Sequence, residues 1–288
     1  MARAITDVGF IGTGNMGAPM AGHLLEAGYR LQVFNRTRSR ADELCSRGAV
    51  WHDDPASLAA ASDAVITIVD APPDVEELYF GVLLERARPG ALLIDMTTSS
   101  PSLAARIHAA AATKGLAALD APVSGGQGGA KEGTLAIMVG GDEAAFARAL
   151  PLFEKMGRNI VHCGAAGRGQ HMKLTNQVMV ASNVLAVAEG LAFAVRGGID
   201  PQTALKVLSE STANSRLLKV YAEKILAGDY APGFFIDHFI KDMTIALAEA
   251  DSLGLDLRAL RNALALFEEL RRRFSGREGI QAVARLYR

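Results

Sequence analysis

The chain has 288 residues, a length that favours two domains, and 50% of them are hydrophobic, which is ample for buried cores. The formal net charge of −1 gives no electrostatic basis for binding nucleic acid or an anionic membrane. Cys45 and Cys163 form neither a CxxC pair nor a disulfide framework, and Met1 to Asp7 contain no apolar signal core. We therefore expect a cytoplasmic protein.

The first informative pattern is a strand, a glycine turn and a helix in that order. An apolar run over residues 8–11 leads into Gly12-Thr13-Gly14-Asn15-Met16-Gly17, and an amphipathic stretch over residues 18–27 follows. In a dinucleotide site the first glycine allows a tight turn, the second lets the backbone approach the pyrophosphate, and the third lets helix and strand pack closely. This context predicts that residues 12–17 bind a dinucleotide.

The end of the next expected strand, residues 31–34, indicates which dinucleotide fits. An NAD site of this type usually carries Asp or Glu here, to hold the adenosine ribose. This chain has Asn35-Arg36-Thr37, so a 2′-phosphate meets no carboxylate and Arg36 offers it a planar fork of donors. The motif favours NADP over NAD, and a solvated basic turn is the alternative.

Strand-like and helix-like runs alternate as far as Cys163. Further strands are expected over residues 64–69, 92–96, 117–120, 135–139 and 160–162, with a weaker one near Val50, and helices over residues 73–84, 101–114 and 142–156. This alternation predicts an α/β fold with a doubly wound parallel sheet. We expect a Rossmann-type domain over residues 1–163.

From Gly164 onward the pattern is helical, which predicts an all-α domain over residues 164–288. A long helix is expected from the Gly167 and Gly169 turns to Arg196, and further helices over residues 201–209, 215–227, 236–253 and 257–274. The short, Arg-rich tail after Phe274 has no pattern that we interpret.

The segment from Val178 to Val195 is apolar enough to suggest a membrane span. Ser182, Asn183 and Glu189 interrupt it, and such groups are expensive in hydrocarbon, so we expect a buried helix. Because one small helical domain cannot cover a helix that is apolar all round, we expect a homodimer or a homotetramer.

Four blocks of residues together resemble the β-hydroxyacid dehydrogenase family. They are residues 12–20, Asp120-Ala121-Pro122-Val123-Ser124-Gly125-Gly126, the segment from Gly167 to Gln177, and Lys241-Asp242. The family includes 3-hydroxyisobutyrate dehydrogenase and tartronate semialdehyde reductase and is related to 6-phosphogluconate dehydrogenase. The resemblance extends from Val8 to about Leu253, with the blocks in the family's order and spacing.

The resemblance implies that Lys173 is the catalytic acid/base. Asn176 and Gln177 lie three and four positions later on the same helical face, where Asn176 would bond the substrate oxygen or hold the lysine and Gln177 would support it. A lysine exchanges protons poorly at neutral pH unless desolvation lowers its pKa. The alternative for Lys173 is an ordinary helix lysine with its amine in water.

The resemblance also implies the remaining contacts. Ser124, Gly125 and Gly126 would hold the carboxylate of a substrate acid, although a plain glycine turn is the alternative reading. Thr98 would lie beside the nicotinamide ribose, and Lys241 would reach the cofactor unless it pairs with a neighbouring acid. Where the family commonly has a Leu-Pro pair, this chain has Val69-Asp70, so we expect a cofactor-facing loop of different shape.

Together these patterns predict an NADP-dependent oxidoreductase that interconverts a small 3-hydroxy acid and its semialdehyde or oxo acid. We expect no metal, because the sequence shows no metal-ligand spacing and His171 and His238 are read as scaffold. One alternative is imine reduction on the same fold, but imine reductases generally lack a lysine at the position of Lys173. A non-catalytic NADP-binding module is the other alternative, and it predicts a damaged catalytic block. The identity of the acid depends on pocket shape.

Overall fold

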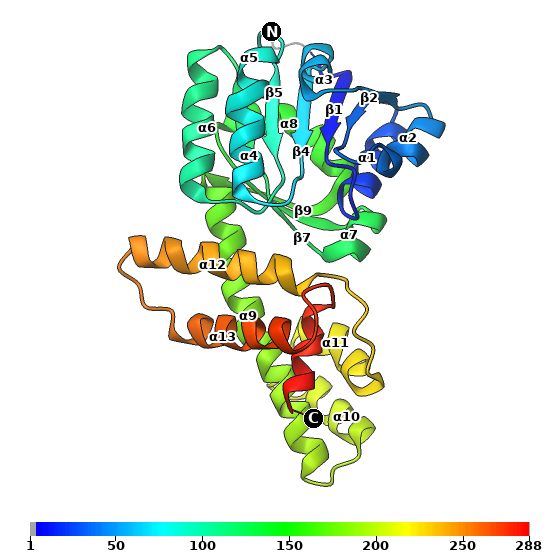
Figure 1. Cartoon of the computed structure of the whole chain (residues 1–288), viewed down its shortest axis with the longest axis vertical. Helices are drawn as coiled ribbons and strands as arrows, with labels where there is room; N and C mark the ends of the chain where they lie inside the picture. The colour runs from blue at the N-terminus through cyan, green and yellow to red at the C-terminus, as the bar shows by residue number, and fades with distance from the viewer. Residues whose placement is uncertain (1–3, 288) are drawn as a thin grey trace. The chain divides into compact units, whose positions relative to one another are not determined.

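The computed structural model describes residues 4–287 and divides into two compact units, Met1–Lys173 and Leu174–Arg288 (Figure 1). The first three residues of the N-terminal segment lie outside the described residues. The boundary falls after Lys173, whereas the sequence placed it after residue 163, because the first turn of the long helix is bonded to the sheet, as described below.

The first unit contains a doubly wound sheet whose first six strands are all parallel. Its strand order is β3-β2-β1-β4-β5-β6-β8-β7, with β9 beside β8. The strands are β1 (Asp7–Ile11), β2 (Arg30–Phe34), β3 (Val50–Trp51), β4 (Ala64–Thr67), β5 (Leu92–Asp95), β6 (Ala117–Asp120), β7 (Val123–Ser124), β8 (Leu135–Gly140) and β9 (Gly157–Gly164). The expected α/β fold class is confirmed.

Successive residues of the central strands point to opposite faces of the sheet and enter two different hydrophobic cores. In β4, Ala64 and Ile66 join one core and Val65 joins the other. The first core lies beneath α1 (Gly17–Glu26) and α8 (Glu143–Met156), and the second lies beneath α3 (Pro55–Ala61), α4 (Pro72–Leu78) and α6 (Pro101–Thr113). Both faces are covered, and Figure 1 shows α4 and α6 together on one side. The sequences of these strands are therefore continuous apolar runs, because both faces of each strand are buried.

Two helices of this unit begin at residues whose side chains cap the first turn. Asp54 accepts the N–H of Ser57 at 2.8 Å, Ser100 accepts that of Leu103 at 3.2 Å, and each is followed by a proline at the first helical position. The helices are α1 (Gly17–Glu26), η1 (Arg38–Ala41), α2 (Asp42–Ser46), α3 (Pro55–Ala61), α4 (Pro72–Leu78), η2 (Tyr79–Leu83), α5 (Leu84–Arg86), α6 (Pro101–Thr113), α7 (Gly126–Glu132) and α8 (Glu143–Met156).

One end of the doubly wound parallel sheet contains antiparallel pairs, which the sequence analysis did not anticipate. β8 runs antiparallel to β6 and β7 and parallel to β9. The link from Ser124 to Leu135 contains the short helix α7 and is shorter than the dozen or so residues of a parallel crossover. The chain therefore returns beside β7 in the opposite direction.

The second unit is helical, as expected. Apart from a single bridge between Phe235 and Gly279, none of its described residues pairs as a strand. Its elements are the greater part of α9 (Arg168–Arg196), then α10 (Pro201–Glu210), α11 (Arg216–Ala227), α12 (Ile236–Ser252), α13 (Arg258–Arg273) and η3 (Ile280–Tyr287). The tail that the sequence left without an interpretation forms η3, and Ile280 and Val283 lie buried in the core of this unit.

Helix α9 is long and apolar enough to cross a membrane by length and composition alone, and 33% of its most apolar stretch is buried. Ala181, Val184, Ala188 and Leu191 form a buried seam at helical spacing. Phe193, in contrast, is 84% exposed. Within one chain, therefore, only the face of α9 that contains this seam is buried, and the face that contains Phe193 is exposed.

A buried polar group lies where β4 and β5 end. Asp95 accepts the N–H of Thr97 at 3.1 Å and the hydroxyl of Thr67 at 3.0 Å, and Thr67 also bonds the phenol of Tyr79 at 3.1 Å. Burial raises the pKa of Asp95 from 3.8 to about 6, although these hydrogen bonds oppose the shift. The folded protein therefore binds a proton at Asp95 more tightly than the unfolded chain does.

This pKa shift predicts a pH-dependent gain of stability for Asp95→Asn. A folded-state pKa above the unfolded value stabilises the wild type fully below pH ~4, and this contribution is lost as the pH rises through about 6. The neutral Asn side chain does not titrate, so the variant keeps its free energy of unfolding as the pH rises. The difference in unfolding free energy in favour of the variant should therefore increase by about 1–3 kcal/mol between pH 4 and 7. Urea unfolding at both pH values measures it.

Asp54→Asn is the matched control with the opposite sign. The pKa of Asp54 is lowered, chiefly by the N–H of Ser57, so this variant should be less stable than the wild type at pH 7. An Asp95→Asn variant whose stability difference is the same at pH 4 and pH 7 would contradict the assignment of a raised pKa.

Candidate functional site

The glycine turn after β1 is built by close backbone approach. Gly12 has φ +100°, and a Cβ there would lie 2.1 Å from the carbonyl oxygen of Ile68. A Cβ on Gly17 would lie 1.8 Å from the carbonyl oxygen of Gly12. At Gly14 a Cβ would meet only Nη1 of Arg40, at 3.4 Å. The turn is therefore closed at its first and third glycines and open at the second, as a phosphate-binding turn requires.

Thr13 provides the observation that tests whether a dinucleotide fits. Its N–H donates to Oδ1 of Asn35 at 3.1 Å, and Asn35 in turn donates to the carbonyl of Thr37 at 2.9 Å. The Thr13 hydroxyl is buried, and within residues 4–287 it has no hydrogen-bond partner. An orphaned hydroxyl beside the open Gly14 backbone fits a polar ligand such as a pyrophosphate. Asn15 beside it is exposed and Met16 is half-buried.

Arg36 is held by acidic side chains that sequence reasoning did not connect with it. Its guanidinium donates to Asp70 at 2.7 Å and to Asp74 at 3.1 Å, although its side chain is 70% exposed. Asp74 also accepts the N–H of Ala71 at the start of α4. The residue pair Val69-Asp70 thus places a carboxylate next to the basic turn, and Asp70 is an ion-pair partner of Arg36.

The loop between β5 and α6, which contains Thr98, is tied to its surroundings at several points. The hydroxyl of Thr97 accepts the N–H of Val69 at 3.0 Å. The amide of Gln170 accepts the N–H of Ser99 at 2.8 Å and donates to the carbonyl of Thr97 at 2.7 Å. The first turn of α9 therefore grips the peptide groups on both sides of Thr98.

Asp120, the last residue of β6, bonds the start of the same helix. Its two carboxylate oxygens accept the N–H groups of Gly167 at 2.7 Å and Gln170 at 2.8 Å. Burial raises the pKa of Asp120, and the helix N–H groups oppose the shift. Lys173 follows one turn later and is only 6% exposed, so it is not a surface lysine in this chain.

Ser124, Gly125 and Gly126 form the junction between β7 and α7. Gly125 has φ +138° and Gly126 has φ +62°, so both occupy backbone conformations that favour glycine. Ser124 and Gly126 are half-buried and Gly125 is exposed. The block is a glycine turn with accessible backbone. This geometry agrees with a plain turn, and it also leaves the backbone N–H groups open to a substrate carboxylate.

In the helical unit, the structure brings together the expected residues of α9 and α12. Asn176 donates to Gln177 at 2.8 Å, and Gln177 donates to Asp242 at 2.7 Å. Nζ of Lys241 lies 3.2 Å from the other carboxylate oxygen of Asp242. Lys241 therefore does pair with its neighbouring acid, and Asp242 links it to the buried Gln177.

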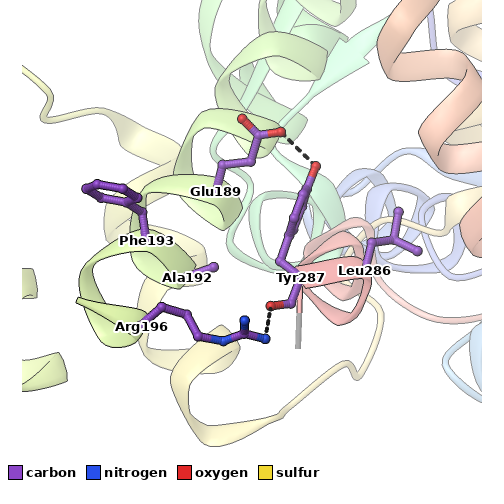
Figure 2. A pocket seen from close by; sticks show the side chains of 6 residues that line it. All are labelled: Glu189, Ala192, Phe193, Arg196, Leu286 and Tyr287. Carbon is purple, nitrogen blue, oxygen red and sulfur yellow. Dashed lines mark hydrogen bonds between the residues drawn. The ribbon is translucent and has the colours of Figure 1, made fainter. Parts of the chain in front are cut away.

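A shallow hollow of about 430 Å³ lies elsewhere in the helical unit (Figure 2). The phenol of Tyr287 donates to Glu189 at 2.8 Å, and Arg196 donates to the Tyr287 carbonyl at 3.3 Å. None of the expected site residues lines this hollow. Among residues 4–287 no cluster of three or more His, Cys, Asp or Glu side chains is arranged to hold a metal ion.

Sequence reasoning missed Asp120 and Gln170. Both lie inside the matched blocks, yet no local pattern shows that a strand-end carboxylate will cap a helix that begins 48 residues later at Arg168. One signal was present in the sequence: Asp120 ends an apolar strand and has no basic residue nearby, so a buried carboxylate with a distant partner could have been expected.

Two family models together match almost the whole chain. Residues 7–164 match the NAD binding domain of 6-phosphogluconate dehydrogenase. Residues 167–287 match the NAD-binding domain of NADP-dependent 3-hydroxyisobutyrate dehydrogenase. The division between the models falls where the sheet ends and the helical region begins.

Full-length relatives agree with these models. The chain is 43% identical to 2-hydroxy-3-oxopropionate reductase of Escherichia coli, covering 87% of this chain and 86% of that protein. It is 38% identical to NAD-dependent L-serine dehydrogenase of Pseudomonas aeruginosa, covering 98% of this chain and 97% of that protein. The structure of Mycobacterium tuberculosis 3-hydroxyisobutyrate dehydrogenase with L-serine superposes with a TM-score of 0.91 at 33% identity, covering 99% of each chain. The chain therefore belongs to the β-hydroxyacid dehydrogenase family of NAD(P)-dependent oxidoreductases.

Proposed function

We propose that this oxidoreductase interconverts a small 3-hydroxy acid and its semialdehyde or oxo acid, with NADP as the preferred cofactor and Lys173 as the acid/base. The observation that carries the proposal is the burial of Lys173 one turn after a helix start that is bonded to the Thr98 loop. The substrates named for the relatives, a hydroxy-oxo acid and L-serine, are small carboxylates and support the substrate class.

In this mechanism the bound cofactor supplies or accepts a hydride at the substrate carbon. Lys173 donates a proton to the carbonyl oxygen during reduction and removes it from the alcohol during oxidation. Asn176 bonds the same oxygen or orients the lysine, while Gln177 supports it through its bond to Asp242. Ser124, Gly125 and Gly126 hold the substrate carboxylate with a hydroxyl and backbone N–H groups.

Lys173→Ala should lower turnover about 10²- to 10⁴-fold, which is the usual contribution of a positioned acid/base. The affinity for NADPH should change little, because the glycine turn and the basic turn belong to other elements of the chain. Lys173→Arg should not restore turnover, since a guanidinium keeps its proton at working pH.

Turnover at saturating substrate and a fluorescence titration with NADPH test this prediction. We propose that the Lys241 ammonium, which lies 3.2 Å from Asp242, turns to the cofactor when it binds. Lys241→Ala is therefore the comparison variant, which should weaken cofactor binding more than the chemical step. Near-normal turnover of Lys173→Ala would show that another group is the acid.

The cofactor preference depends on the charges around Arg36. Arg36→Ala should weaken NADPH binding about tenfold and leave NADH binding nearly unchanged, because only NADPH carries the 2′-phosphate. Asp70→Asn removes a competing carboxylate 2.7 Å from the guanidinium and should tighten NADPH binding about two- to fivefold, as expected of an exposed pair.

Dissociation constants for both nucleotides, measured by fluorescence at two salt concentrations, test the cofactor assignment. The effect of Asp70→Asn should shrink at high salt. A wild type that binds NADH as tightly as NADPH would contradict the role given to Arg36.

We also propose that a second copy of the chain covers the open face of α9. Met179 is 63% exposed and Phe193 is 84% exposed on this helix, and Phe193 lines the hollow drawn in Figure 2. Large apolar side chains gathered on one helix are typical of protein interfaces.

Light scattering at micromolar concentration should therefore give a mass of at least twice 30.4 kDa. Phe193→Glu should shift the protein toward the monomer. Val50→Glu, at a residue that is 51% exposed on β3, is the matched control and should leave the mass unchanged. A wild-type monomer at these concentrations would exclude the proposed dimer.

A further inference from the structure

The start of α9 is capped by a side chain from a distant strand. The first N–H groups of an α-helix have no partner within the helix. Two of the N–H groups at this helix start donate to the carboxylate of Asp120, from Gly167 at 2.7 Å and from Gln170 at 2.8 Å. A carboxylate here also interacts favourably with the helix dipole. Asp120 is 3% exposed, so these bonds are shielded from water.

The close packing around Asp120 admits no side chain at two neighbouring positions. A Cβ on Gly140 would lie 2.5 Å from Oδ1 of Asp120, and a Cβ on Gly169 would lie 2.4 Å from the carbonyl oxygen of Met138. The backbone of α9 therefore meets the strand ends directly. Such a contact has little freedom to shift.

Gln170 connects this helix start with the loop that contains Thr98. Its side chain is fully buried, and it bonds Ser99 N–H at 2.8 Å and the Thr97 carbonyl at 2.7 Å. These two groups flank Thr98 in the chain. Lys173 follows Gln170 by three residues and so lies on the same face of the helix.

We propose that Asp120 and Gln170 are positioning residues that fix Lys173 relative to the Thr98 loop. We call the pair the α9 anchor. The anchor acts through Lys173, and this inference rests on the proposed acid/base role of that residue. A displacement of about 1 Å in a reacting group can cost about 10²-fold in rate, so a helix start held by four buried hydrogen bonds has a direct catalytic consequence.

The test is a double-mutant cycle. Gln170→Ala and Asp120→Asn are each made in the wild type and in Lys173→Ala. Gln281→Ala is the matched control, because Gln281 is also fully buried and bridges two backbone carbonyls, those of Asp229 and Ala231. Turnover, KM, NADPH dissociation constant and melting temperature are measured for every folded variant.

In the wild-type background, Gln170→Ala and Asp120→Asn should lower turnover about tenfold or more, with the NADPH dissociation constant changed less than about twofold. In the Lys173→Ala background the same substitutions should change the residual turnover by less than about twofold. Gln281→Ala should lower the melting temperature without this dependence on the background. An equal loss in both backgrounds, or no loss in the wild type, would overturn the positioning role.

Amide hydrogen exchange provides a readout that does not depend on turnover. The backbone N–H groups of Gly167, Ser99 and residue 170 should exchange faster in Gln170→Ala than in the wild type. The exchange test needs only this variant, so it can be carried out even if Asp120→Asn does not fold. Unchanged exchange at these amides would refute the anchor. Near-normal turnover of Lys173→Ala refutes instead the acid/base role given to Lys173 in the proposed function, so the two failures are distinguishable.

Discussion

The hydrogen bonds between the buried carboxylate of Asp120 and the first turn of α9 are the constraint that holds the start of the long helix against the sheet. They connect a parallel strand to the helix that contains Lys173, across a long stretch of sequence. A buried carboxylate is costly without partners, but here helix N–H groups that would otherwise be unpaired supply them. The carboxylate and the helix N–H groups satisfy each other, which explains how both are tolerated in a buried position.

Glycines allow close backbone contacts at two places in the sheet unit, the turn after β1 and the contact between β8 and α9. At the turn after β1, Gly12 and Gly17 let the strand, the helix and the neighbouring strand β4 meet at backbone distance. At the other end, Gly140 and Gly169 do the same for β8 and α9. In both places a missing side chain brings backbone N–H groups to the carboxyl edge of the sheet, where α/β folds bind ligands.

The charges at the basic turn show how tertiary contacts modify a motif. By sequence alone, Asn35-Arg36-Thr37 is a basic turn, yet Asp70 and Asp74 come from a later crossover and bind the guanidinium of Arg36. Asn35 itself supports the glycine turn through Thr13. The motif therefore contains one residue that holds the backbone and one whose charge is paired with two acids.

The sequence by itself determined the α/β class, the helical second region and the family, because strand and helix periodicities are local and the glycine blocks have fixed spacing. It also placed most elements to within a few residues, as for β6 over Ala117–Asp120. Only the tertiary structure decided the antiparallel return at β8, the packing of η3, the partners of Arg36, and the Asp120 and Gln170 contacts. These depend on residues that are far apart in the chain, and local patterns contain no information about which distant side chains will meet. The physical reason is that a buried polar group takes whatever partner the packing brings to it.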